Sequence, residues 1–234
     1  KLPRFYFKHL LYRRDVENWR SYLTDREEQR VQAAIKDSIG RPFLNSKLLF
    51  HQHFTIPGIE LPRLIGYNVG PTFVWHGRHQ RLTSARELAS LIDGIHRETG
   101  GGRIFAKPVG GIHGNQCFIL GSPPLAALDQ TERDFEELRS GSFIFEHALV
   151  QHSALSAIHP DSVNTLRVVT YTPHDGVSQL VSTLLRFGAG GRCVDNASSG
   201  GVFVKVDAQS GALLPYARKF HEFGGTVHLV HPDT

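Results

Sequence analysis

Residues 105–114 join a strand-like run to a cluster of glycines, with Lys107 between them. The residues of the loop that follows include Gly110, Gly111, His113 and Gly114. Glycines let backbone N–H groups approach an anion closely, and a lysine adds a positive charge for a phosphate oxygen. The pattern predicts a phosphate site, although a glycine hairpin beside a surface lysine would have the same sequence. It is neither a Walker A loop nor a dinucleotide fingerprint, because no Gly-Lys-Ser/Thr is present and a strand is expected after the glycines.

A second group of polar residues begins where an apolar run ends in Glu146 and continues through Gln151 and Asn164 to Arg167. Arg167 enters an apolar strand, and an arginine is costly to bury without an anionic partner. A bound phosphate would serve. The alternative is a structural salt bridge, for instance with Glu146 or Asp161, so both interpretations stay open.

A third group consists of Arg186 and the run 194–201, in which Asp195 and Asn196 precede two glycines. These residues could hold a substrate or position a loop over phosphate, and they could equally form an ordinary turn. The chain has 14 histidines without zinc-ligand spacing and two cysteines without a paired motif. We expect most of the histidines to be structural or at the surface.

The elements that must position these residues indicate an α+β fold. Amphipathic spacing and capping residues predict helices at 15–39, 84–99 and 129–140. We expect Asp15 and Gly40 to bound the first helix, and Ser84 with Glu87 to form a capping box on the second. Prolines punctuate 42–75, which favours short strands and turns. Further strands are expected at 103–107, 116–120 and 142–150, and hairpins from 164–172 with 177–187 and from 201–207 with 212–217.

Composition narrows the classes of function. The 234 residues are 40% hydrophobic and 21% charged, as in globular proteins, and carry a formal net charge of +4. A small basic excess suits an anionic ligand, and without basic runs interleaved with aromatics no nucleic-acid partner is expected. No integral membrane segment or signal peptide is recognisable, and two cysteines favour a reducing, cytoplasmic setting. The absence of methionine suggests part of a longer reading frame.

Taken together, the motifs resemble the ATP-grasp superfamily, in particular the sugar-transfer-associated ATP-grasp proteins, which are related to α-L-glutamate-ligase-like proteins. The resemblance runs from about residue 43 to the end of the chain. It is carried by Asn45-Ser46-Lys47, Lys107-Pro108 with Gly110, Gly111 and Gly114, Glu146 with Gln151-His152, Pro160, Ser162, Asn164-Thr165-Leu166-Arg167, Val194-Asp195-Asn196 with Gly200-Gly201, and His231-Pro232.

The resemblance implies two α+β lobes that clasp ATP between β-sheets. It divides the chain into an N-terminal helical segment (1–42), a small lobe (43–145) and an incomplete large lobe (146–234). The residues expected to bind ATP are Lys47, Lys107, Gly110, Gly111, His113, Gly114, Glu146, Leu149, Gln151 and Asn164. Of these, the lysines would contact phosphates, the hinge from Glu146 to Leu149 would lie beside adenine, and Gln151 would reach the ribose. Arg167, Arg186 and Asn196 would act on the transferring phosphoryl group.

The implied activity is that of an ATP-dependent carboxylate–amine ligase acting through an acyl phosphate, in polysaccharide or sugar modification, with ATP and Mg²⁺ as cofactors. The family's acidic metal ligands lie in later Trp-Asp and Glu-x-Asn motifs, which this sequence does not contain before Thr234. We therefore expect a C-terminally truncated chain, with Asp195 as one candidate metal ligand. The partners would be a small carboxylate and a small amine. The alternatives are a phosphotransferase on the same fold, a non-catalytic nucleotide-binding module and a basic nucleic-acid-binding protein.

Overall fold

The structure is a computed structural model that describes residues 23–34, 40–54, 58, 60–111, 114, 116–121, 128–174 and 176–233. The chain divides into two compact units, 1–45 and 46–234. The segment and lobe boundaries expected after residues 42 and 145 stay predictions. Within the described part of the chain, no helix has the length and apolar character needed to cross a membrane.

The first unit contains α2 (Asp25–Ala34) and α3 (Gly40–Asn45). The Thr24 hydroxyl accepts the Glu27 N–H at 3.3 Å, and the Glu27 carboxylate accepts the Thr24 N–H at 2.8 Å. This capping box starts α2 at Asp25, and residues 23–24 before it are not helical, so the expectation of one continuous helix over 15–39 is wrong. The expected start at Asp15 stays a prediction. Gly40 opens α3 instead of ending the helix before it. Residues 15–22 and 35–39 lie outside the described residues.

The expectation of short strands and turns is wrong for residues 42–45 and 47–53, which are helical. Pro42 lies in the first turn of α3, where its missing N–H leaves no intrahelical bond unmade. The second unit then opens with α4 (Lys47–His53), for which the Ser46 hydroxyl accepts the Leu49 N–H at 3.3 Å. Pro42 therefore does not interrupt α3, and α4 contains no proline.

A six-stranded antiparallel sheet follows, in the order β3-β2-β1-β6-β4-β5. Its strands are β1 (Leu64–Val69), β2 (Thr72–Trp75), β3 (Arg78–Arg81), β4 (Ile104–Pro108), β5 (Phe118–Leu120) and β6 (Ser142–His147). The strands expected around the glycine loop and before the connector are confirmed. Strand β3 was not predicted, because its four residues, Arg-His-Gln-Arg, are all exposed.

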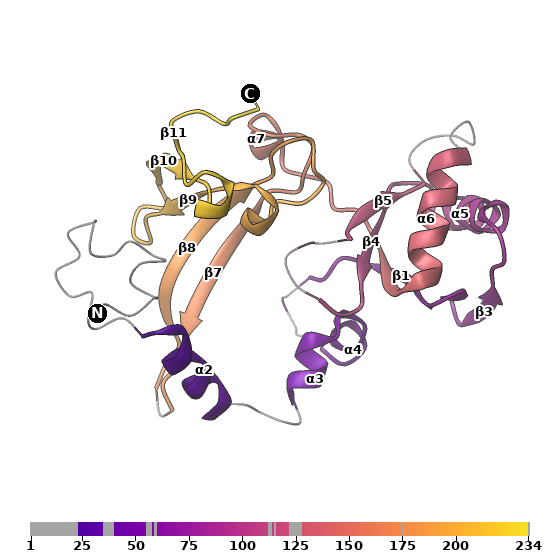
Figure 1. Cartoon of the computed structure of the whole chain (residues 1–234), viewed down its shortest axis with the longest axis horizontal. Coiled ribbons are helices and arrows are strands. Elements are labelled where there is room, and N and C mark those ends of the chain that lie inside the picture. The colour runs from indigo at the N-terminus through magenta and orange to yellow at the C-terminus, as the bar shows by residue number, and fades with distance from the viewer. Residues whose placement is uncertain are drawn as a thin grey trace. The chain divides into compact units, whose positions relative to one another are not determined.

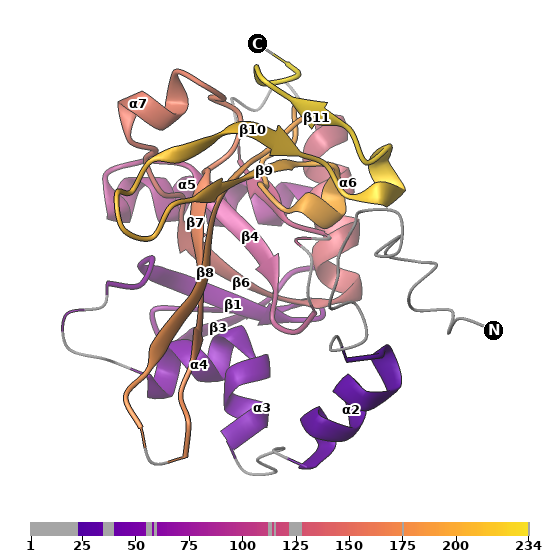
Figure 2. The same cartoon turned by 90° about the vertical axis from the view of Figure 1, so that its left-hand side faces the viewer.

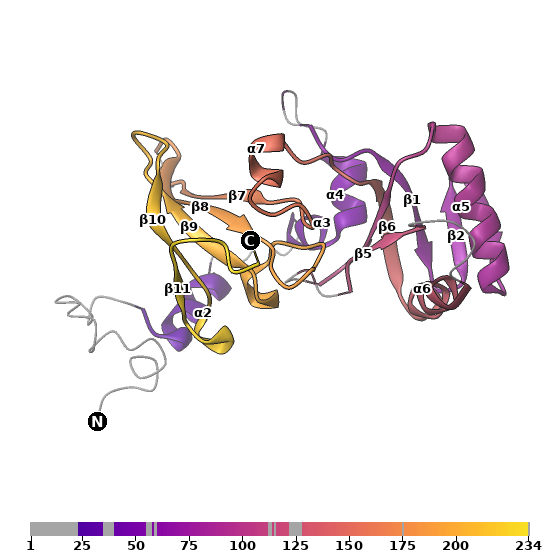
Figure 3. The same cartoon turned by 90° about the horizontal axis from the view of Figure 1, so that it is seen from above.

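Two helices cover one face of this sheet, as Figures 1 and 3 show: α5 (Ala85–Thr99) and α6 (Leu128–Ser140). Both predicted helices are confirmed. Ser84 caps α5 by accepting the Glu87 N–H at 3.3 Å, and Gly100 ends it in the left-handed conformation at φ 78°. The Glu87 carboxylate reaches the N–H of Thr83 at 2.6 Å, one residue before the position of the expected box.

Successive side chains along β4 and β6 point to opposite faces of the sheet. Ala106 and Phe145 pair across the strands and belong to the core under α5 and α6. Lys107 and Glu146 therefore project from the opposite face. The core that holds these two strands thus fixes where both charged groups emerge.

The second sheet has five antiparallel strands in the order β11-β10-β9-β8-β7, which are labelled in Figure 2. Its strands are β7 (Thr165–Tyr171), β8 (Gln179–Phe187), β9 (Val202–Val206), β10 (Leu213–Arg218) and β11 (Val227–His228). Both predicted hairpins are confirmed. The short elements beside it are α7 (Ser153–Ser156) and the 3₁₀ turns at Ala197–Ser199 and His221–Phe223. A small core of Phe187, Val202 and Val204 packs against Leu155 and Ile158.

Candidate functional site

A cavity of about 740 Å³ in the second unit gathers most of the residues selected from the sequence. Of the predicted site residues, those that line it are Lys47, Lys107, Gly110, Gly111, Gly114, Glu146, Leu149, Gln151, Arg186, Asp195 and Asn196. These residues are far apart in the sequence, and the fold brings them together around one cavity.

Lys107 and Glu146 form an ion pair on the face of the first sheet opposite α5 and α6. The Lys107 Nζ lies 2.7 Å from Glu146 Oε2. The other oxygen of the carboxylate, Oε1, lies 2.5 Å from Nε2 of His51 on α4. Glu146 is 2% exposed, whereas Lys107 keeps 21% of its side chain accessible. The carboxylate is thus enclosed with two donors, and the lysine remains open to the cavity.

Lys47, the first residue of α4, holds the glycine loop. Its Nζ donates to the carbonyl oxygens of Gly110 at 3.3 Å and Gly111 at 3.1 Å. Its backbone N–H donates to Val109 O at 2.8 Å. Burial lowers the pKa of the Lys47 ammonium, and the positive charge of Lys107 adds to this effect. No described carboxylate lies within ion-pair distance of Lys47, so its charge is available to an anion in the cavity.

Arg186 and Asp195 meet across Thr165 on the side of the cavity formed by the second sheet. Arg186 Nη2 donates to the Thr165 hydroxyl at 2.6 Å and lies 3.3 Å from Asp195 Oδ1. The Thr165 hydroxyl also donates to Asp195 Oδ2, and the Thr165 N–H donates to the same oxygen at 2.9 Å. Asp195 is buried, and burial raises the pKa of its carboxyl, although the bonds from Thr165 and the charge of Arg186 oppose that shift.

Asn196 approaches the glycine loop closely. A Cβ placed on Gly114 would overlap with Asn196 Oδ1, at a separation that real Cβ atoms essentially never show. Gly114 also has φ 67°, which disfavours other residues. Glycine is therefore favoured at 114 for two separate reasons, its positive φ and the position of the Asn196 side chain.

Asn164 does not line the cavity, in contrast to the expectation. It is 4% exposed, and its side chain accepts from the Ser162 hydroxyl at 2.8 Å and donates to His159 O at 2.9 Å. Its backbone N–H donates to Gln151 Oε1. Asn164 therefore holds the segment that carries Gln151, and a direct contact with nucleotide has no support in this arrangement.

Arg167 also lies outside the cavity lining, and His113 lies outside the described residues. The register pairs Thr165 with Arg186 and Arg167 with Leu184, so Arg167 is on the same sheet face as Arg186 but two residues further along β7. Its side chain is exposed. The structural salt bridge considered for Arg167 is absent, since no described carboxylate pairs with it.

Both cysteines line the cavity. Burial raises the pKa of Cys117 to about 11 and also raises the pKa of Cys193. Cys193 Sγ lies 3.6 Å from the Cys117 carbonyl oxygen. Thiols with raised pKa values are poor nucleophiles near neutral pH.

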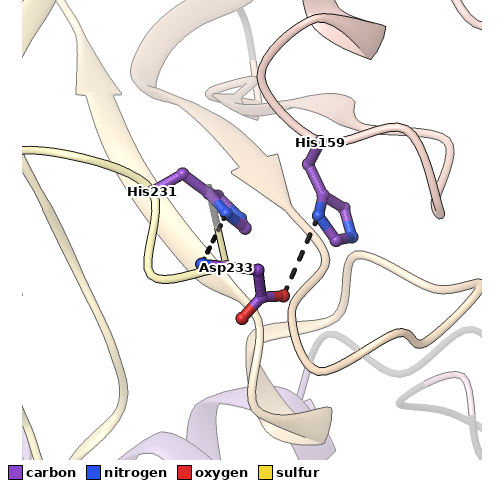
Figure 4. Close-up of side chains that lie close together, drawn as sticks. All are labelled: His159, His231 and Asp233. Atoms are coloured by element: carbon purple, nitrogen blue, oxygen red, sulfur yellow. Dashed lines mark hydrogen bonds and ion pairs between the residues drawn. The ribbon is translucent and has the colours of Figure 1, made fainter.

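The described cavity residues do not fit a magnesium ion well. Asp195, the candidate ligand, already bonds Thr165 and pairs with Arg186, and a cation beside that arginine would meet like charge. The described group with metal-ligand proximity is His159, His231 and Asp233 (Figure 4), none of which lines the cavity.

That trio has the geometry of a packing contact. The two rings stack with centroids 4.7 Å apart and planes 28° apart, whereas ligating nitrogens must point their in-plane lone pairs at one ion. The His231 nitrogens already bond Gly188 O at 2.8 Å and Asp233 N at 3.2 Å. We therefore assign this trio to the packing of the C-terminal segment.

The residues of the site that were missed from the sequence include His51 and Thr165. His51 follows Lys47 by one helical turn, a signal that appears only once residues 47–53 are known to be helical. Thr165 belongs to the motif Asn164-Thr165-Leu166-Arg167, but a threonine in a strand gives no reason by itself to expect a role in the site.

The arrangement suits a molecule with a flat apolar part and a polyanionic part. Four cationic side chains line the cavity, from Lys47, Arg103, Lys107 and Arg186, together with the backbone of the glycine loop. Apolar groups line it as well, including those of Phe105, Ile119, Leu149 and Val194. A ring packed on these side chains with phosphates reaching the cations would satisfy both parts.

Comparison with known proteins gives one family. The family model described as sugar-transfer associated ATP-grasp matches residues 28–234. A search of curated proteins finds no match to the chain.

Proposed function

Because the chain belongs to the sugar-transfer associated ATP-grasp family, we propose that it binds ATP in this cavity and acts as an ATP-dependent carboxylate–amine ligase. The observation that carries the proposal is the convergence of Lys47, Lys107 and Arg186 on one cavity beside a glycine loop. The first two come from α4 and β4, and the third comes from the other sheet. Such a set of fixed cations neutralises the charge of a triphosphate.

In this proposal the triphosphate lies along Lys47, Lys107 and the loop from Gly110 to Gly114. The adenine lies against the apolar wall that includes Phe105 and Leu149, next to the connector that follows β6. Gln151, whose Oε1 is held by the Asn164 N–H, keeps its amide nitrogen for the ribose. Lys47 would have to exchange one of its carbonyl partners for a phosphate oxygen.

The chemistry would run in two displacements. A carboxylate oxygen of the substrate attacks the γ-phosphorus, the bond to ADP breaks, and an acyl phosphate forms. An amine then attacks the acyl carbon, phosphate leaves, and the amine gives up a proton to yield an amide. Arg186 and Asn196 would stabilise the transferring phosphoryl group, and catalysis would consist of positioning and charge stabilisation. No step is assigned to a metal, since the described residues do not offer it a suitable set of ligands.

The family supports a proposal for the class of acceptor. Its association with sugar transfer supports a carboxylate or amine carried by a sugar or by a sugar-derived compound, in polysaccharide or sugar modification. A second candidate is a nucleotide-binding module without turnover. It is favoured by one observation: Glu146 and Asp195, both buried carboxylates of the cavity, are ion-paired to Lys107 and Arg186.

Calorimetry with ATP and excess Mg²⁺ tests the nucleotide site. The chain should bind with a Kd in the micromolar range, and Lys107→Ala should raise that Kd about tenfold or more while a matched variant of an exposed lysine, Lys205→Ala, leaves it unchanged. Absence of binding by the wild-type protein would contradict the proposal. Release of ADP and phosphate with an amide product would support the ligase, and binding without turnover in the presence of sugar acids and amines would support the second candidate.

A further inference from the structure

His51 and Glu146 form a buried contact between α4 and β6 that the proposed chemistry does not use. The Nε2 of His51 lies 2.5 Å from Glu146 Oε1, and the side chains are 9% and 2% exposed. A contact this short and this enclosed fixes the orientation of the carboxylate.

Glu146 is in turn the partner of Lys107. The register places Phe105 opposite Glu146 and Lys107 opposite Ile144, so Lys107 and Glu146 are diagonal neighbours on one face of the sheet. Their contact of 2.7 Å uses Oε2, the oxygen that His51 leaves open. One carboxylate therefore receives a donor on each oxygen, one from the helix and one from the neighbouring strand.

We propose that His51 is a positioning residue for the phosphates of the nucleotide, acting through Glu146 on Lys107. With Oε1 occupied by His51, Glu146 binds Lys107 through Oε2 alone. The ammonium of Lys107 then keeps its other N–H donors for the cavity, where 21% of the side chain is accessible. Without His51, both oxygens of the buried carboxylate would accept hydrogen bonds from Lys107. The ammonium group would then have fewer N–H donors left for phosphate.

This inference rests on the proposed nucleotide function, and it differs from a role for His51 in holding α4. That helix has other attachments in the described structure. Its first N–H donates to Val109 O at 2.8 Å, its Ser46 cap accepts the Leu49 N–H, and Lys47 Nζ binds the loop carbonyls. Loss of the His51 contact should therefore leave the helix in place and change only the direction in which the Lys107 ammonium group points.

The test compares His51→Leu with His51→Gln. Leucine removes the donor, and glutamine keeps an N–H donor near the position of Nε2. We expect His51→Leu to raise the Kd for ATP about tenfold, and His51→Gln to restore it to within about threefold of wild type. His79→Leu, on the exposed strand β3, serves as the control and should leave the Kd unchanged.

Binding of adenosine distinguishes a role of His51 in positioning phosphate from general damage to the site. Adenosine carries no phosphate, so its binding, followed by ligand-observed NMR, should be unaffected by His51→Leu. A weakening of adenosine and ATP by the same factor would overturn the inference in favour of a structural role. A Kd for ATP that does not respond to His51→Leu would overturn it as well.

A double-mutant cycle provides the second measurement. If His51 acts through Lys107, adding His51→Leu to Lys107→Ala should weaken ATP no further. Full additivity would overturn the inference while leaving the nucleotide site intact. Failure of wild-type protein to bind ATP, by contrast, would remove the proposed function itself, so the two failures are distinguishable.

Discussion

Arg186 and Asp195 lie 3.3 Å apart, and the hydroxyl of Thr165 is hydrogen-bonded to both of them. The hydroxyl accepts from the arginine and donates to the carboxylate, so one small side chain completes the pair. Because Asp195 is buried, each donor it receives offsets part of the cost of removing its charge from water.

Replacing Thr165 tests that bridge. Thr165→Val keeps the shape of the side chain and removes its hydroxyl, so it should lower the free energy of unfolding by about 1–2 kcal/mol. Thr165→Ser keeps the hydroxyl and should lose less. Urea denaturation of the two variants measures the difference, and a valine variant as stable as the serine variant would show that the bridge is not formed.

Arg186 and Arg167 provide a matched pair on one face of the second sheet. Only Arg186 lines the cavity. We expect Arg186→Gln to lower kcat for ATP turnover about 100-fold, as for loss of a group that stabilises the transferring charge. Arg167→Gln should have a smaller effect, confined to turnover, with nucleotide affinity retained. If Arg167→Gln lowered kcat more than Arg186→Gln does, the transferring phosphoryl group would instead lie beside Arg167, outside the cavity.

Cys117 should be slow to alkylate near neutral pH. Its pKa is raised to about 11 by burial, so only about one thiol in a thousand is ionised at pH 8. Iodoacetamide labelling, followed by peptide mass spectrometry, should accelerate about tenfold for each pH unit between 8 and 10. Bound ATP should slow it further, because Cys117 lines the cavity. Rapid labelling at pH 7 would contradict the enclosed environment.

Asn68 is a stability determinant of the first sheet. It is 0% exposed; its side chain donates to Gly70 O and Leu138 O, both at 2.7 Å, and accepts the Phe143 N–H at 3.0 Å. Asn68→Leu leaves these backbone groups unpaired and should cost about 3 kcal/mol of stability. Gln80→Leu, an exposed amide on β3, is the control and should change stability by less than about 0.5 kcal/mol.

Asp134 on α6 should give a pH-dependent difference in stability. Burial raises the pKa of its carboxyl above the ordinary 3.8, against the opposing hydrogen bond from Gln130 and the charge of Arg133. The folded state therefore binds the proton more tightly than the unfolded state, and stability falls as pH rises from 3.8 through the raised pKa. Asp134→Asn should be the more stable protein at pH 7, with the advantage shrinking toward pH 4. A difference independent of pH would contradict this assignment.

The elements predicted well from the sequence are those with strong local signals. Helix α5 has a serine cap and a terminal glycine, and both hairpins of the second sheet have turn residues between alternating strands. Helix α4 was missed because four prolines between 42 and 71 suggested turns, although none of them falls within residues 47–53. Prolines in a sequence indicate where a helix or strand can begin or end, but they do not predict which of the two lies between them.

Most of the candidate site was predicted, because charged residues next to glycines in apolar surroundings are typical of sites that bind an anion. The exceptions depended on tertiary structure. Asn164 and Gln151 belong to the same group of polar residues in the sequence, yet Gln151 lines the cavity and Asn164 does not, because the Asn164 side chain bonds the segment around it. Arg167 and Arg186 have similar surroundings in sequence, and the strand register alone separates them. His51 could be recognised only from the position of Glu146.

Gly114 sets how near the first sheet's loop can come to the segment around Asn196. Because residue 114 has only a hydrogen as its side chain, the loop lies against the amide oxygen of Asn196. A methyl group at 114 would overlap with that oxygen, so either the Asn196 side chain would rotate away or the loop would move back. Gly114→Ala therefore tests how firmly the amide of Asn196 is held against the glycine loop.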